Sequence, residues 1–449
     1  MEHQERSKML GAMPMSRLVP KVSVPIMVSM LVQALYNVVD GIFVARYSAD
    51  AFTAVSLVMP VQMLMIAVST GLGVGINSLV SRRLGERRGE DAVNAARNGI
   101  MLELCGYLLF FLFGTFAARS FMHVFTDEAH VQQMGGQYLT IVTACSFGLF
   151  LSMVFERLMQ ATGNTVLSMV TQLSGALTNI ILDPIMIFVL KMGVAGAAWA
   201  TVIGQMVSMI LGITLNQTRN RELRMTLRGF RPEGKSIREI LQVGIPSIVM
   251  QAISSVMNVL MNMILLGFGN TAVNVLGVYF KLQSFVFMPV FGLGNGLVAI
   301  VGYNFGARLR ERVYEALRVA LRLALIIMGV GMLVFLTIPQ ALLSLFEAGD
   351  AGDLTALGCR ALRIISSQFL FAAVGIVMTT VFQAVGKGTY SLLMSLCRQL
   401  IVLVPAAWLL SRLGGVNVVW WAFPIAELVS LCICLFLYRK VDREMLQKL

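Results

Sequence analysis

Apolar stretches long enough to cross a lipid bilayer recur along almost the whole chain. A bilayer core of about 30 Å is crossed by a helix of about 20 apolar residues. Gly, Pro and charged residues separate twelve such stretches, at 18–45, 52–80, 93–118, 136–160, 166–190, 194–215, 239–267, 272–300, 316–343, 357–382, 390–411 and 416–438. With 57% hydrophobic and only 13% charged residues, the chain lacks the polar surface of a soluble domain. We therefore predict an all-α integral membrane protein with twelve transmembrane helices in the lipid bilayer.

The charged residues lie between the apolar stretches and predict the orientation of the chain. Basic residues gather at 82–88, 219–238, 308–312 and 439–448, whereas the opposite loops carry acidic residues at 127–128 and 347–353. By the positive-inside rule both termini are cytoplasmic, in the cell inner (plasma) membrane. The net charge of +12 thus reflects topology, and no nucleic-acid partner is expected. The six cysteines form no CxxC pair, so neither disulfides nor a zinc site are expected.

The two halves of the sequence repeat each other. A constant offset of 221 residues relates Pro25 to Pro246, Asn37 to Asn258, the Gly71, Gly73, Gly75 run to Gly292, Gly294, Gly296, and Gly85 to Gly306. We predict an N-terminal six-helix lobe at 1–215, a basic cytoplasmic linker at 216–238 and a homologous C-terminal lobe at 239–449. Because each half has an even number of spans, both insert in the same direction. The glycine runs lack the other features of a phosphate loop and indicate close helix packing.

Polar residues form two stripes in the first half. In the first span the stripe has i, i+3, i+4, i+7 spacing, and in the fifth it has i, i+7, i+11 spacing. The first stripe is Gln33, Tyr36, Asn37 and Asp40, and the second is Gln172, Asn179 and Asp183, bordered by Thr178. A charged residue within a span costs roughly 2.5–3.5 kcal/mol, so its presence indicates function. We predict that the two stripes face one polar cavity; the alternative is that both aspartates only anchor helix ends.

Pro184 directly follows Asp183. A proline inside a helix removes one backbone hydrogen bond, which frees the carbonyl of Ile180. A carboxylate beside a freed carbonyl suits a small cation.

The second half keeps the polar stripe but loses the charge. Met261 occupies the position equivalent to Asp40, although the seventh span carries the polar residues Gln251 and Asn258. The cation chemistry is therefore expected in the first half. Further candidates for a substrate cavity are Gln205, Lys281, Glu103 and Glu427, each of which can instead serve packing. The three histidines show no metal-ligand spacing, so the chain is not expected to be an enzyme.

Three motifs resemble the multidrug and toxic compound extrusion (MATE) family over nearly the whole chain. They are Asn37-Val38-Val39-Asp40-Gly41-Ile42-Phe43-Val44, Asn179-x-x-x-Asp183-Pro184 and Gln160-Ala161-x-Gly163. The resemblance implies two six-helix bundles around a central cleft. It also implies a cation-binding site of Asp40, Asn179 and Asp183, open to a proton or a sodium ion, with Tyr36 and Asn37 nearby. The NorM-like branch uses acidic residues in spans 7 and 10. This chain has Gln251 at the likely span-7 position, and its span 10 has Arg363 near the start but no carboxylate, so it looks closer to the branches that rely on N-lobe aspartates.

These observations favour a monomeric antiporter that exports small organic cations by alternating access. The exchanged ion is H⁺ or Na⁺, and no other cofactor is expected. A lipid-precursor flippase of the same superfamily is a second hypothesis, but it needs clustered arginines. The spans hold only scattered basic residues: Arg157, Lys281, Arg322, Arg363 and Arg398. A membrane scaffold without transport is the third hypothesis.

Overall fold

A computed structural model of the chain describes residues 6–224, 230–345 and 352–449. The side chains of Arg6, Asn37, Val38, Ala45 and residues 352–354 also lie outside the described part. The predicted linker at 216–238 and the predicted acidic segment at 347–353 are therefore described only in part. The described residues form helices joined by short turns, without a β-strand.

The first half consists of nine α-helices and two short irregular helices. They are α1 (Arg6–Ala12), α2 (Met15–Tyr47), α3 (Ala49–Gly85), α4 (Gly89–Phe116), α5 (Ala118–Phe125), α6 (Ala129–Ala144), α7 (Phe147–Ala161), α8 (Thr165–Pro184), the π-helix η1 (Ile185–Val189), α9 (Val194–Arg219) and the 3₁₀-helix η2 (Arg221–Leu223).

The second half follows the same plan. Its helices are α10 (Gly234–Leu266), α11 (Asn270–Gly306), α12 (Arg310–Thr337), α13 (Pro339–Ser344), α14 (Gly352–Ser366), α15 (Phe369–Ala384), α16 (Gly388–Leu396), the π-helix η3 (Cys397–Leu403), α17 (Val404–Leu413), α18 (Val416–Val419), α19 (Ala422–Val441) and the π-helix η4 (Asp442–Leu446).

Ten of the described helices are long and apolar enough to cross a membrane, and two bent helix pairs bring the number to twelve. The pairs are α6 with α7, bent by 42°, and α14 with α15, bent by 49°. At each bend a serine hydroxyl donates to the carbonyl three residues earlier, Ser146 to Thr143 and Ser367 to Ile364, both at 2.7 Å. Such side-chain bonds compete with the helix ladder and favour a bend. The fold is the predicted all-helical membrane architecture.

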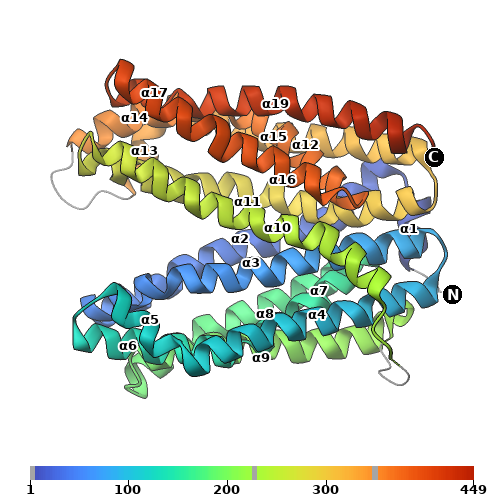
Figure 1. Cartoon of the computed structure of the whole chain (residues 1–449), viewed down its shortest axis with the longest axis horizontal. Helices are drawn as coiled ribbons and strands as arrows, with labels where there is room; N and C mark the ends of the chain where they lie inside the picture. The colour runs from blue at the N-terminus through green and yellow to red at the C-terminus, as the bar shows by residue number, and fades with distance from the viewer. Residues whose placement is uncertain (1–5, 225–229, 346–351) are drawn as a thin grey trace.

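Figure 1 shows two bundles of helices lying side by side, α2–α9 in one and α10–α19 in the other. Both chain termini lie at the same end of the molecule, which we call the terminal end; the opposite end is the distal end. The bundles meet through the first two helices of each half, because α3 packs on α10 and α2 packs on α11. Their ribbons lie closest at the terminal end and diverge towards the distal end (Figure 1).

The apolar core has the same asymmetry. One large buried cluster runs through both bundles and includes residues of α1, the start of α2 and the end of α3, such as Leu10, Leu18 and Ile76. A second cluster, with Val58, Phe110 and further residues, belongs to the first bundle alone and lies around the distal halves of its helices. The two bundles therefore share one core at the terminal end, whereas the first bundle has a core of its own at the distal end.

Glycines make the close contact between the bundles possible, as the repeated glycine runs predicted. At six of them an added Cβ would lie 2.0–2.7 Å from an atom of the other bundle. Four of these contacts are Gly71 with Ile248, Gly292 with Met27, Gly85 with Tyr303, and Gly306 with Arg82; the other two are Gly75 with Ile240 and Gly296 with Ser23. Subtracting 221 from Ile248 gives Met27, and subtracting it from Tyr303 gives Arg82, so the first four contacts are reciprocal between the repeats.

The short helix α1 joins the two bundles and the linker at the terminal end. Leu10 is fully buried, and its carbonyl accepts hydrogen bonds from Asn304 Nδ2 at 2.9 Å and Arg312 Nη2 at 3.1 Å. The backbone N–H of Ser7 donates to Glu222 Oε1 at 2.9 Å. These contacts fix α1 against α11 and α12 of the second bundle and against η2.

Candidate functional site

Two aspartates from different helices meet inside the first bundle. Asp40 lies on α2 and Asp183 near the end of α8, and these two helices pack against each other. The two carboxyl groups lie close enough to share a hydrogen bond. Asp183 is fully buried and Asp40 is half-buried, and each has one buried oxygen without a hydrogen-bond partner among the described residues. A hydrogen bond between two carboxyl groups requires a proton on one of them.

Asn179 connects Asp183 to α9. With its amide oriented to satisfy both neighbours, Asn179 Nδ2 donates to Asp183 Oδ2 at 2.9 Å. The amide oxygen then accepts from the hydroxyl and the backbone N–H of Thr201, at 3.2 and 3.0 Å. The amide stands one helical turn before Asp183 on α8, which places both side chains on one face. The contact is close because Gly204 of α9 lies directly beside Asn179.

Two tyrosines complete the site. The hydroxyls of Tyr36 on α2 and Tyr138 on α6 both interact with the Thr201 hydroxyl. Both tyrosines are also close enough to the two aspartates for a carboxylate charge to act on them. Tyr138 is only 2% exposed, and its hydroxyl accepts from Gln62 Nε2 of α3 at 3.1 Å. Five helices, α2, α3, α6, α8 and α9, thus contribute polar groups to one buried cluster.

The backbone beside Asp183 departs from the regular helix. Pro184 ends α8, and the π-helix η1 follows at once. The second half also has a π-helix beside its matching proline, but on the other side of it: η3 ends at Leu403, just before Pro405, which stands 221 residues after Pro184. Wide π turns are frequent at functional sites. In the second half, however, Val404 replaces Asp183 and the fully buried Met261 replaces Asp40.

The cluster provides oxygen ligands and negative charge. Oxygen ligands suit H⁺ and hard cations such as Na⁺ rather than the nitrogen- and sulfur-binding transition metals. Within the described residues, no three His, Cys, Asp or Glu side chains gather as they do around a transition metal. The arrangement can exchange a proton or hold a small cation.

Several residues of the predicted stripes lie away from the cluster. Gln172 Nε2 donates to Glu156 Oε2 at 2.5 Å, so this side chain serves another buried group. The Thr178 hydroxyl donates to the Ser174 carbonyl of its own helix at 2.7 Å. Gln33 is exposed on α2, and the buried amide oxygen of Gln205 has no hydrogen-bond partner within the described part of the chain. The side chain of Asn37 is not among those described.

The candidates in the second half do not converge on one site. Gln251 Nε2 donates across the bundle interface to the Ala67 carbonyl at 3.4 Å. Glu427 is bound by Arg398 Nη1 at 3.3 Å, an ion pair within its own bundle. Asn258 is half-buried on α10, and Lys281 is exposed on α11.

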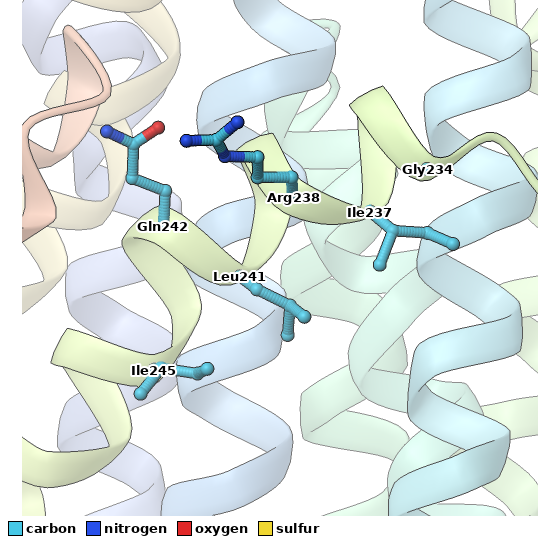
Figure 2. A pocket seen from close by; sticks show the side chains of 6 residues that line it. All are labelled: Gly234, Ile237, Arg238, Leu241, Gln242 and Ile245. Atoms are coloured by element: carbon cyan, nitrogen blue, oxygen red, sulfur yellow. The ribbon is translucent and has the colours of Figure 1, made fainter.

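One open groove lies far from the aspartates. Figure 2 shows its lining, which comes entirely from one face of α10 near the terminal end: Gly234, Ile237, Arg238, Leu241, Gln242 and Ile245. Its volume is about 480 Å³. A groove formed by one helix does not enclose a ligand, so we assign it no role in binding.

The sequence did not indicate Thr201, Tyr138 or Gln62. Each is a neutral polar residue in an apolar span, and none lies on a stripe that contains a charged residue. Thr201 has one usable signal: it follows the Trp199-Ala200 pair, which the second half repeats as Trp421-Ala422 with Phe423 in place of the threonine. The second half thus has an aromatic ring where the first half has this hydroxyl. The difference indicates that the polar site lies in the first half.

With this fold and site described, the chain can be placed in a family. The MatE family model matches residues 25–185 and 246–409, so the chain belongs to the MATE family of membrane transporters. It is 26% identical over 428 residues to the multidrug export protein MepA of Staphylococcus saprophyticus, covering 95% of this chain and 94% of that protein. It is 25% identical to MepA of Staphylococcus aureus, covering 94% and 93%.

Solved structures show the same fold. The chain is similar to a multidrug resistance MATE family transporter in an outward-facing conformation, with a TM-score of 0.94 and 26% identity over the full length of both chains. A transporter of the MOP superfamily from Pyrococcus furiosus gives a TM-score of 0.93 and 26% identity, again over both full lengths.

Proposed function

We propose that this chain is a plasma-membrane antiporter that exports organic cations in exchange for protons bound at Asp40 and Asp183. The observation that carries the proposal is the close approach of these two carboxyl groups inside the first bundle. We propose that the pair shares one proton and carries one negative charge in this conformation. A second proton would neutralise it, so proton binding and cation binding are mutually exclusive. On this proposal the chain resembles the branches that rely on N-lobe aspartates.

Alternating access is supported by the asymmetry of the interface. The bundles share a core and close glycine contacts at the terminal end, whereas the first bundle has a separate core at the distal end. Because the basic loops lie at the terminal end, we propose that this end faces the cytoplasm. Export then needs a second conformation in which the terminal-end contacts open.

The flippase hypothesis finds less support. A pyrophosphate group calls for several arginines in one cavity. Arg157 donates to Gln160, Arg363 to the Leu336 carbonyl, and Arg398 pairs with Glu427, so these three guanidinium groups point to separate partners. They do not form one anion site.

Transport of a fluorescent organic cation into inside-out proteoliposomes tests the proposal. With ethidium as the probe, an imposed pH gradient of one unit supplies about 1.4 kcal/mol, which supports about tenfold accumulation for one-for-one exchange. We expect Asp40→Asn and Asp183→Asn to insert and fold, because the amides keep hydrogen bonds, but to lose gradient-driven accumulation. Asp50→Asn is the matched control, because Asp50 is an exposed aspartate at the start of α3.

Each outcome decides one part of the proposal. Accumulation under a sodium gradient but not under a pH gradient would assign the same site to Na⁺ and reject proton exchange. Wild-type accumulation in both aspartate variants would reject the site itself.

A further inference from the structure

A second group of charged side chains is buried in the first bundle, away from the aspartate pair. Glu103 lies in the middle of α4, and Glu156 and Arg157 lie near the end of α7. Glu103 is 0%, Glu156 4% and Arg157 5% exposed. Gln172, which binds Glu156, precedes Asp183 by eleven residues on α8, or about 16 Å along the helix axis at 1.5 Å per residue. The group is therefore separate from the aspartate pair and nearer to the terminal end.

The hydrogen bonds leave one of these side chains unpartnered. Glu156 accepts from Gln172, and Arg157 Nη1 donates to Gln160 Oε1 at 3.1 Å. Neither carboxyl oxygen of Glu103 has a hydrogen-bond partner of regular geometry among the described residues, and neither has Arg157 Nε. The Ser69 hydroxyl of α3 and the Arg157 guanidinium are the polar groups that act on Glu103. Arg157 is thus near Glu103 but directed to Gln160.

An ionised carboxylate in this environment would be a buried charge without a direct partner. Such a charge is strongly unfavourable in a low-dielectric interior, and the group binds a proton instead. Resting on the proposed antiport function, we propose that Glu103 is a second proton-binding site of the transporter and that Arg157 is its switchable counter-ion. When Glu103 is protonated, Arg157 binds Gln160, as in this structure. When Glu103 loses its proton, Arg157 turns from Gln160 to the carboxylate.

The proton step is balanced on Glu103 itself. An O–H bond forms at one carboxyl oxygen when hydronium in the bundle interior gives up a proton and becomes water. The bond breaks when that proton returns to water in the other conformation.

The position of Arg157 connects this proton to the bundle interface. An added Cβ at Gly73 would lie 2.9 Å from Arg157 Cγ, so the arginine stem packs directly on α3. Gly71 and Gly75, on either side of Gly73, form the contacts with Ile248 and Ile240 of α10. Movement of the arginine therefore changes the packing of the α3 segment that holds the bundles together.

No other charged group replaces Arg157 in this role among the described residues. The remaining charged residues of α4 and of the helices packed against it, together with the histidines, lie towards helix ends: Asp50, Arg82 and Arg83 of α3, Glu90, Asp91 and Arg97 of α4, Arg119 and His123 of α5, His130 of α6, Arg221 and Glu222 of η2, and Lys235, Arg238 and Glu239 of α10. The other titratable side chains on these helices are Cys105 and Tyr107 of α4 and Tyr138 of α6, none of which is a cation. Glu156 is held by Gln172, as described above.

Infrared difference spectroscopy tests the proposal without transport. Full-length protein carrying isotopically labelled glutamate is compared at acidic and alkaline pH in lipid bilayers. We expect a protonated glutamate band in the wild type and the loss of one carboxyl group's share of that band in Glu103→Gln. In Glu103→Asp we expect this one carboxyl group to absorb in the aspartate region of the spectrum instead of the glutamate region. An unchanged glutamate band in Glu103→Gln, or no protonated glutamate band in the wild type, would overturn the proposal.

The same spectra separate this proposal from the proposed function. Asp40→Asn removes an aspartate band and leaves the Glu103 band, whatever it does to export. If ethidium export were normal in both aspartate variants while the Glu103 band behaved as expected, the proposed function would fail and the second proton site would stand.

Discussion

A single methyl group at Gly75 tests whether the glycine contacts hold the two bundles together. A Cβ at this position would lie 2.3 Å from the carbonyl oxygen of Ile240 and 3.1 Å from Ile240 Cγ2. The first distance is to backbone, so rotation of a side chain cannot relieve it. Overpacking of this kind costs about 1–3 kcal/mol. Because Ile240 belongs to the other bundle, the cost falls only on the conformation in which the terminal end is closed.

The expected result is a shift of the conformational equilibrium. At about 1.4 kcal/mol per factor of ten, Gly75→Ala favours the conformation open at the terminal end by roughly 5- to 140-fold. The shift can be measured as the distance between spin labels at Glu90 and Lys235, two exposed positions on α4 and α10, in a cysteine-free background. We expect the longer-distance population to grow in Gly75→Ala.

The matched control is Gly277→Ala. Gly277 is a glycine of α11 with no atom within 4 Å of its added Cβ. This variant should keep the wild-type distance distribution. If Gly75→Ala also kept it, with an unchanged melting temperature, the glycine contact would not be a determinant of the closed state.

Three further predictions concern neighbouring contacts. Glu239→Gln removes the partly exposed ion pair with Arg83, whose N–O distance is 2.8 Å. It should shift the equilibrium between the closed and open terminal end by only a few-fold, because such pairs contribute up to about 1 kcal/mol. A hundredfold shift would contradict this. Asn304→Ala removes a hydrogen bond to α1 and should increase amide hydrogen exchange there; unchanged exchange would show that α1 is held otherwise. Tyr36→Phe removes the hydroxyl that interacts with Thr201. Because one hydrogen bond contributes about 1 kcal/mol, we expect ethidium export to slow several-fold while folding stays intact. A wild-type export rate would show that Tyr36 is not part of the site.

Much of the fold could be predicted because it depends on local composition. Apolar length predicts spans, and the 221-residue offset predicts that both halves share one plan. The bends near Ser146 and Ser367 were not predicted, since a serine in an apolar span can equally remain in a straight helix. The short helix α1 was also missed, because its burial depends on contacts with α11 and α12, more than 290 residues away.

The site was predictable only where its residues share a helix. Helical spacing placed Tyr36 with Asp40 and Asn179 with Asp183, but it does not show which neighbouring helices face them. Thr201 and Tyr138 come from two other helices, and their roles depend on packing. Gln172 illustrates the opposite error: the spacing placed it on the Asp183 face, but eleven residues along α8 separate it from the aspartates, and it binds Glu156 instead.

The reciprocal glycine contacts carry a consequence for the origin of the molecule. In a two-fold symmetric homodimer, a residue that contacts a second residue on the partner is matched by the reverse contact. Gly71 with Ile248 and Gly292 with Met27 have this relation, as do Gly85 with Tyr303 and Gly306 with Arg82. The present interface therefore has the self-complementary form of a symmetric dimer, as the joining of two copies of one six-helix unit would produce. The interiors of the two bundles differ, because one has Asp40 where the other has Met261.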